Sequence, residues 1–105
     1  MNKFSNQVYQ KLQQVPSGKV TTYGDIARAI GSKAYQAVGQ AMKNNPDPKN
    51  IPCHRVIKSN GTLGGYFGRQ DKAILTKKKN KLQKEGIKFN GDIIVKLNMI
   101  KFVYD

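Results

Sequence analysis

Three prolines in seven residues, at positions 46, 48 and 52, most constrain how this 105-residue chain can fold. Proline fixes its own φ, lacks a backbone donor and favours extended geometry in the residue before it. Residues 46–52 can therefore form neither a helix nor a central strand. They make a stiff segment directly before Cys53 and His54. These are the only cysteine and the only histidine in the chain. A rigid backbone that fixes the position of one reactive side chain predicts a catalytic or binding site rather than a flexible linker.

Hydrophobic periodicity predicts helices before this stiff segment. Phe4, Val8 and Leu12 recur every four residues, which indicates an amphipathic helix that ends before Pro16. Residues 22–25, Thr-Tyr-Gly-Asp, resemble a capping box that begins a second short helix.

A helix-turn-helix pattern follows, because Gly31 suits the end of the second helix and Ser32 is expected to cap a third that reaches about Lys43. The small side chains of that third helix allow two interpretations. They either permit tight packing, which we expect of Val38 and Ala41, or form a recognition face for DNA. The residues expected on that face are Lys33, Ala34, Gln36, Ala37 and Gly39.

The second half of the chain is predicted to supply a pocket wall, a basic helix and a hairpin. Residues 62–68 form a glycine-rich loop without the Gly-Lys-Ser/Thr of a nucleotide-binding loop. Asp71 can cap a helix that runs to Glu85, whose lysines face either solvent or DNA, and Gly86 closes it. Residues 87–97 read as a β-hairpin, and the apolar residues 99–104 are expected to dock on the domain. The fold class is therefore one mainly α domain over 1–105, with a winged-helix-like helix-turn-helix and a short C-terminal hairpin.

The charge balance favours a polyanionic partner. The chain has 19 Lys and Arg against 6 Asp and Glu, a net charge of +13, and both halves are basic. Nucleic acid is the first candidate, and the alternative is an ordinary lysine-rich surface. No apolar run approaches the roughly 20 residues of a membrane helix, so no membrane partner is expected. A single cysteine cannot form an internal disulfide, which favours the cytoplasm, near a nucleoid, or the nucleus.

The chemistry expected of Cys53 depends on its neighbours. A free cysteine is most often a small buried hydrophobe, and at neutral pH an ordinary thiol is only a few per cent thiolate. His54 is the nearest candidate base, and a carboxylate should orient its ring, for which the sequence offers Asp71, Glu85 and Asp92. One cysteine and one histidine make a poor zinc site, so neither a metal nor a cofactor is expected.

The segment 45–57, N-P-x-P-x-x-I-P-C-H-R-V-I, resembles the active-site signature of the O6-alkylguanine-DNA alkyltransferases. The resemblance runs from about Val20 to Gly86 and includes Val-Thr-Thr-Tyr-Gly-Asp-Ile-Ala, Gly-Gly-Tyr and Glu-Gly. It implies direct repair of double-stranded DNA by a monomer. The thiolate would take the alkyl group from guanine O6, and possible further substrates include O4-alkylthymine. Because the product is a thioether, the protein would act once.

The resemblance also implies residue roles. Glu85 would orient His54, which would polarise Cys53 through a water, and Tyr23 would donate a hydrogen bond to the leaving guanine. Asn45 would brace the turn before the active site. The implied pocket residues are Val56, Gly65, Tyr66 and Phe67. The implied DNA contacts are Tyr23, Arg55 and the recognition-face residues, with the helix-turn-helix in the minor groove and the nucleotide flipped out.

Some features depart from the family pattern. Gln36 stands where an arginine normally fills the gap left by the flipped base, which predicts slower or weaker flipping. Phe67 stands where a smaller residue is common, which narrows the pocket against bulky alkyl groups. The segment 66–85 is longer than usual, and the separate N-terminal domain of many members is not expected here.

Three other functions are open. Alkyltransferase-like proteins bind alkylated guanine without transferring the group and carry tryptophan in place of Cys53. A helix-turn-helix regulator would explain the charge but not the Pro-Cys-His-Arg mount. A Cys-His hydrolase would need an oxyanion hole, of which the sequence gives no sign.

Overall fold

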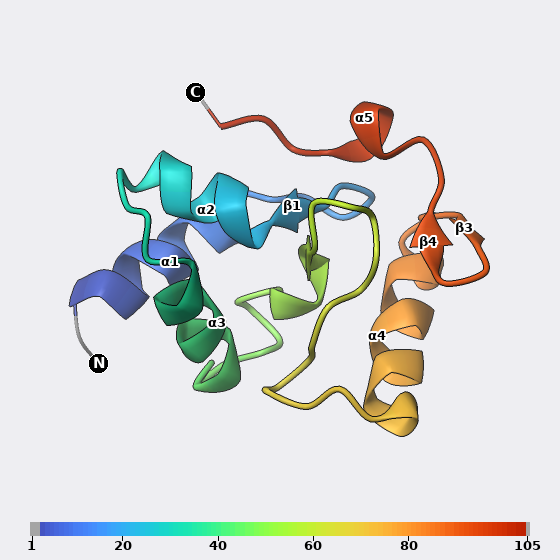
Figure 1. The fold of residues 1–105 in the computed structure, drawn as a ribbon, viewed down its shortest axis with the longest axis horizontal. Coiled ribbons are helices and arrows are strands. Elements are labelled where there is room, and N and C mark those ends of the chain that lie inside the picture. The colour runs from blue at the N-terminus through green and yellow to red at the C-terminus, as the bar shows by residue number, and fades with distance from the viewer. Residues whose placement is uncertain (1–2, 105) are drawn as a thin grey trace.

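A computed structural model describes residues 3–104 and shows a mainly helical fold, as predicted (Figure 1). Two pairs of very short strands accompany the helices. The elements in chain order are α1 (Lys3–Gln13), β1 (Thr21–Thr22), α2 (Tyr23–Ala29), α3 (Tyr35–Lys43), the 3₁₀ turn η1 (Cys53–Arg55), β2 (Val56–Ile57), α4 (Lys72–Lys84), β3 (Phe89–Asn90), β4 (Ile93–Ile94) and α5 (Leu97–Ile100).

The helices form two groups, with α1, α2 and α3 together and α4 apart from them (Figure 1). The segment from β2 to α4 passes between the two groups. Val8, Ile26 and Val38, one from each of the first three helices, are fully buried in one core cluster. A second cluster joins Leu82 of α4 to residues from both strand pairs and from the segments beside them, which are Val20, Ile57, Leu63, Ile87 and Ile94. The glycines between β2 and α4 therefore lie where two packed units meet.

A parallel pairing of β1 with β2 joins the start of α2 to the end of the cysteine segment. Thr21 lies opposite Val56 and Thr22 opposite Ile57. Sequence reasoning predicted extended backbone near Thr21 and burial of residues 56–57, but it did not predict that these segments pair. The pairing matters because it brings Tyr23, the first residue of α2, to the neighbourhood of Cys53.

The helix ends agree with the sequence in all but one case. The Thr22 hydroxyl caps α2 by accepting the Asp25 N–H at 3.0 Å, as predicted. Gly31 adopts a φ of +71°, which favours glycine. The prediction that Ser32 caps α3 is wrong. Its hydroxyl accepts the N–H of Ala34 at 2.9 Å, which closes a turn ahead of the helix, so the cap position falls to Ala34 without a side-chain bond.

The C-terminal half follows its prediction in outline. Asp71 caps α4, and the Ile87 N–H bonds to the Leu82 carbonyl at 3.1 Å across Gly86, as in the predicted Schellman stop. β3 and β4 form the predicted hairpin, but it is shorter than expected and α5 follows it. In the tail, the Tyr104 hydroxyl donates to the Lys11 carbonyl. Met99 and Val103 are exposed instead of docked, so the prediction for the tail holds only in part.

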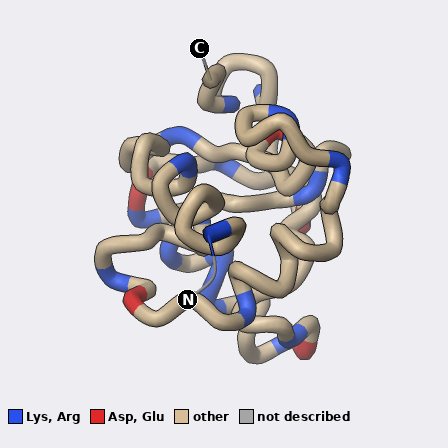
Figure 2. The backbone as a smooth tube through the Cα atoms, turned by 90° about the vertical axis from the view of Figure 1, so that its left-hand side faces the viewer, with Lys and Arg blue, Asp and Glu red and all other residues tan. Residues whose placement is uncertain are grey.

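Lysines and arginines occur along the whole tube of Figure 2, and acidic residues are few. Within residues 3–104, three arginines (Arg28, Arg55 and Arg69) and two lysines (Lys79 and Lys101) form ion pairs with acidic side chains, and α4 carries a run of three lysines. Within residues 3–104, no helix combines the length and the hydrophobicity needed to cross a bilayer.

Candidate active site

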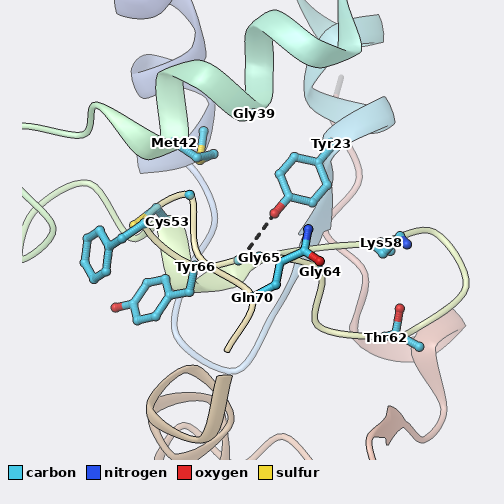
Figure 3. Close-up of a pocket in the computed structure, with 12 residues that line it drawn as sticks. Tyr23, Gly39, Met42, Cys53, Lys58, Thr62, Gly64, Gly65, Tyr66 and Gln70 are labelled. Carbon is cyan, nitrogen blue, oxygen red and sulfur yellow. Dashed lines mark hydrogen bonds between the residues drawn. The ribbon is translucent and has the colours of Figure 1, made fainter. Parts of the chain in front are cut away.

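A cavity of about 470 Å³ lies beside Cys53 (Figure 3). Its size falls within the roughly 300 to 1,000 Å³ typical of pockets for small molecules. The cavity lies between the helix-turn-helix and the glycine-rich loop. Its lining includes Tyr23 of α2, Gly39 and Met42 of α3, Cys53 of η1, and Lys58, Thr62, Gly64, Gly65, Tyr66, Phe67, Gly68 and Gln70. Cys53 is only 4% exposed, but it borders this cavity and is not sealed in the core.

Asn45 holds the turn that carries Cys53. Its side-chain amide donates to the Ile51 carbonyl at 2.8 Å, and its side-chain oxygen accepts the Asp47 N–H at 2.9 Å. The Cys53 N–H in turn donates to the Ile51 carbonyl at 2.8 Å. These contacts agree with the bracing role expected of Asn45, and with the prolines they fix the direction of the thiol.

Glu85 contacts both residues that follow the cysteine. Its Oε2 lies 2.8 Å from Nε2 of His54, and the Arg55 guanidinium donates to both carboxylate oxygens at 2.7 and 3.0 Å. Glu85 caps the C-terminal end of α4, so the length of that helix sets the position of the carboxylate. The predicted contact of Glu85 with His54 is confirmed, whereas Asp71 caps α4 and Asp92 is paired with Lys79 at the surface.

Burial opposes charge on both the thiol and the imidazole. Burial raises the pKa of Cys53, and a hydrogen bond from Asn45 and the positive charges of Lys78 and Lys81 lower it in part. Burial lowers the pKa of His54, which the hydrogen bond and charge of Glu85 raise only in part. His54 is therefore neutral at physiological pH, as a base must be before it accepts a proton. The water expected between His54 and Cys53 stays a prediction.

Tyr23 points from α2 into the cavity, and its hydroxyl donates to the Gly65 carbonyl at 3.4 Å (Figure 3). Gly64 adopts a φ of +71°, and a Cβ there would lie 3.2 Å from the Tyr23 ring. The loop thus needs glycine to approach the tyrosine. Tyr66 and Phe67 stack with their ring centroids 4.2 Å apart and border the same cavity. Tyr23, Gly65, Tyr66 and Phe67 therefore all border one cavity next to Cys53, and their contacts with a bound base stay predictions.

Two predicted side chains lie elsewhere. Val56 is fully buried in the main core cluster and does not line the cavity, because its strand turns its side chain inward. Arg55 was expected to contact DNA, but its guanidinium bonds to Glu85 and to the Val15 carbonyl at 2.8 Å. Its side chain is only 16% exposed, so Arg55 fixes the carboxylate in place.

The predicted recognition face lies on the surface beside the cavity. Lys33, Ala34 and Gln36 are exposed, Ala37 is half-buried, and Gly39 borders the cavity itself. Val38 and Ala41 are buried on the opposite side of α3, as predicted. The helix-turn-helix thus presents one face to the core and another to the surface next to Cys53.

Sequence reasoning missed several residues. Met42 was assigned to the core only, yet it also borders the cavity, and Lys58 and Gln70 were not singled out. Thr62 and Gly68 lie in the loop that the sequence predicted as a pocket wall. Lys78, one of a run of three lysines, is fully buried. The apolar neighbours Ile74 and Leu82, four residues away on either side, were the signal that this lysine lies on the core face of α4. Across residues 3–104, no three potential metal-binding side chains of the His, Cys, Asp or Glu type group together.

The similarity to known proteins covers most of the chain. Residues 3–87 match the family described as 6-O-methylguanine DNA methyltransferase, DNA binding domain. Alkyltransferase-like protein 1 of Schizosaccharomyces pombe is 36% identical over 99% of this chain and 96% of its own length. The constitutive methylated-DNA–protein-cysteine methyltransferase of Bacillus subtilis is 52% identical over 62% of this chain and 40% of its own length. The bifunctional methyltransferase/endonuclease of Picrophilus torridus is 45% identical over 80% of this chain, which spans 27% of that relative.

Solved structures of similar fold include complexes with DNA. S. pombe Atl1 in complex with damaged DNA containing O6-carboxymethylguanine superimposes with a TM-score of 0.82 at 33% identity, covering 99% of this chain and 98% of that one. Mycobacterium tuberculosis OGT in complex with DNA superimposes with a TM-score of 0.72 at 37% identity. The match covers 81% of this chain and 50% of that one. With the family match over residues 3–87, these likenesses show that the chain belongs to the 6-O-methylguanine DNA methyltransferase family.

Proposed function

We propose that this protein repairs DNA by transferring the alkyl group of O6-alkylguanine to Cys53. The observation that carries the proposal is a cysteine at the edge of a cavity, with His54 beside it in the chain and Glu85 2.8 Å from the imidazole. The cavity adjoins a helix-turn-helix in a strongly basic chain, which suits a base flipped out of a duplex.

The reaction proceeds as an in-line displacement at the alkyl carbon. Cys53 sulfur forms the new bond, the bond to guanine O6 breaks, and the Tyr23 hydroxyl donates a hydrogen bond to the departing base. The thioether has no good leaving group, so each molecule acts once. Lys33, Ala34 and Gln36 lie against the minor groove, where readout is poor in sequence information, as suits repair at any site.

A lesion sensor is the second candidate, and the near full-length similarity to S. pombe alkyltransferase-like protein 1 favours it. Cys53 favours transfer, because alkyltransferase-like proteins carry tryptophan at that position. A sensor would use the same cavity to hold the alkylated base without bond formation.

One experiment separates the candidates. The protein is incubated with a duplex that contains O6-methylguanine and is then weighed intact. We expect the mass of one added methylene unit on Cys53 and no gain for Cys53→Ser, which should still bind the lesion. Lesion-selective binding without a mass gain would show a sensor. Equal affinity for damaged and undamaged duplex, again without a gain, would contradict both candidates and favour a regulator.

A further inference from the structure

Lys78 of α4 is fully buried, although lysine is almost never fully buried without a partner. Its Nζ donates to three backbone carbonyls, at 2.5 Å from Val56, 2.6 Å from Leu63 and 2.8 Å from Gly65. A neutral amine has only two N–H donors, so three acceptors at these distances require the ammonium form. The structure therefore holds a positive charge in its interior.

This buried charge needs a negative partner. None of the ion pairs found within residues 3–104 includes Lys78. A buried cation without an anion costs much free energy. Burial lowers the pKa of Lys78 to about 7, and the negative charge of Cys53 raises it. In return, the charge of Lys78 lowers the pKa of Cys53.

The relay through His54 leaves this need unmet. Glu85 shares its charge between His54 and Arg55, which donates to both of its oxygens, and within residues 3–104 no hydrogen bond or ion pair joins it to Lys78. The other groups whose charges act on Cys53 or respond to it are Lys81 on α4, Tyr23 on α2 and Tyr9 on α1. Lys81 is exposed, and water screens its charge.

We propose that Lys78 is a positioning residue for alkyl transfer: its ammonium is the counter-cation of the Cys53 thiolate and ties the backbone after Cys53 to the loop that walls the pocket. The inference rests on the function proposed above and deepens it. Val56 belongs to β2, directly after η1, while Leu63 and Gly65 belong to the loop, so one ammonium spans both sides of the site.

Transfer removes the charge that this arrangement depends on. The thiolate electron pair forms the S–C bond, the C–O6 bond breaks, and guanine leaves with that pair and takes up one proton from solvent. The sulfur is then neutral, and Lys78 loses its anion. A Lys78 that releases its proton keeps only two donors for three carbonyls, so the loop at residues 63–65 loosens after the reaction.

The first test uses iodoacetamide, which forms a thioether with thiolate and releases iodide. Because Cys53 is the only cysteine, intact mass gives its alkylation rate as a function of pH. We expect Lys78→Met to move the inflection upward by roughly one pH unit or more, and Lys78→Arg, which retains a cation, to restore much of the shift. The control is Lys77→Met, an exposed neighbour on α4 that should leave the inflection in place. An unmoved inflection in Lys78→Met would overturn the proposal, and the plateau at high pH reports access to the sulfur separately.

The second test needs no variant and so does not depend on whether Lys78→Met folds. Wild-type protein is methylated on Cys53 with methyl iodide, and amide hydrogen exchange is compared with that of the free protein. We expect protection of residues 63–66 to fall by roughly tenfold above pH 7, with α2 as internal reference. Equal protection before and after methylation would refute the coupling. Neither test contains DNA, so the two proposals can fail separately. If the wild-type protein does not repair the lesion but the inflection shifts in Lys78→Met, only the proposed function is contradicted. If repair is normal and the inflection does not shift, only the role of Lys78 is contradicted.

Discussion

Glu85 and His54 are 31 residues apart in the chain, but the carboxylate Oε2 lies 2.8 Å from the imidazole Nε2. The contact joins the C-terminal end of α4 to the turn η1, which belong to different parts of the fold. The same carboxylate holds Arg55, whose guanidinium also reaches the Val15 carbonyl after α1. One acid therefore holds the imidazole next to Cys53 and ties the two groups of helices together.

Glu85→Gln tests the orienting role. The amide cannot support positive charge on His54 and leaves Arg55 without its ion pair, so we expect the single-turnover transfer rate to fall by roughly tenfold or more. Intact mass against time on an O6-methylguanine duplex measures this rate. Asp92→Asn is the matched control, since that side chain is 89% exposed and should change nothing. Equal rates for Glu85→Gln and wild type would remove Glu85 from the mechanism.

Tyr23→Phe tests the hydrogen bond to the leaving base. The ring that contacts Gly64 is kept, and the hydroxyl that donates to Gly65 is lost. One hydrogen bond made in the transition state corresponds to roughly a tenfold fall in the transfer rate at saturating DNA, with little change in affinity. Tyr35→Phe, at an exposed tyrosine of α3, serves as control. A fall in affinity with an unchanged rate would assign Tyr23 to binding instead.

Gln36→Arg tests nucleotide flipping. Gln36 is exposed on the recognition face and can occupy the gap left by a flipped base without adding a cation. We expect the arginine variant to flip faster and bind more tightly, by up to roughly tenfold, as read from a fluorescent base analogue beside the lesion. Gln40→Arg, also exposed on α3, controls for charge alone. Wild-type rates and affinities in Gln36→Arg would refute the prediction.

Phe67→Ser tests the width of the pocket. Phe67 stacks on Tyr66 and borders the cavity, so its truncation enlarges the space beside Cys53. We expect the ratio of the rates for O6-benzylguanine and O6-methylguanine to rise by several-fold, since extra apolar volume favours the larger group. Gln70→Ser, on the same cavity lining, is the comparison. An unchanged ratio would show that Phe67 does not set the size limit.

Acid should destabilise the protein through Glu85 and His54. Burial raises the pKa of Glu85, but its hydrogen bonds and ion pairs with Arg55 and His54 outweigh this and hold the pKa below its ordinary 4.5. Burial holds the pKa of His54 below 6.5. In both cases the unfolded chain binds more protons, so stability rises with pH. The contribution of these two groups is complete above about pH 6.5, and it declines first through His54 and then, below about pH 4.5, through Glu85.

Urea unfolding between pH 7 and pH 3 measures this dependence. In Glu85→Gln, the decline in stability below about pH 4.5 should be absent, because glutamine does not titrate. Asp92→Asn again serves as control, and equal slopes for Glu85→Gln and wild type in that range would contradict the assignment.

Local sequence alone determined helices α1 to α4, the caps of α2 and α4, and the stiff turn that carries Cys53. Thr22, Asp71 and Gly86 act through bonds within three to five residues, and proline acts through its own ring, so no distant contact is needed. The site residues from Tyr23 to Glu85 were predicted through the family resemblance. Without that resemblance, the sequence offers three acids, Asp71, Glu85 and Asp92, as partners of His54.

Only the tertiary structure decided which of the local alternatives holds. The parallel pairing of β1 with β2, the inward position of Val56 and the burial of Lys78 depend on segments far apart in the chain. Arg55 looked like a surface cation, but Glu85 and Val15, which are far apart in the chain, both bind its guanidinium. Lys78 belongs to a run of three lysines, and only the three carbonyls from β2 and the loop make one position of that run a buried ammonium. The sequence gives the type of each ionisable residue, but tertiary packing determines whether water or protein surrounds its charge.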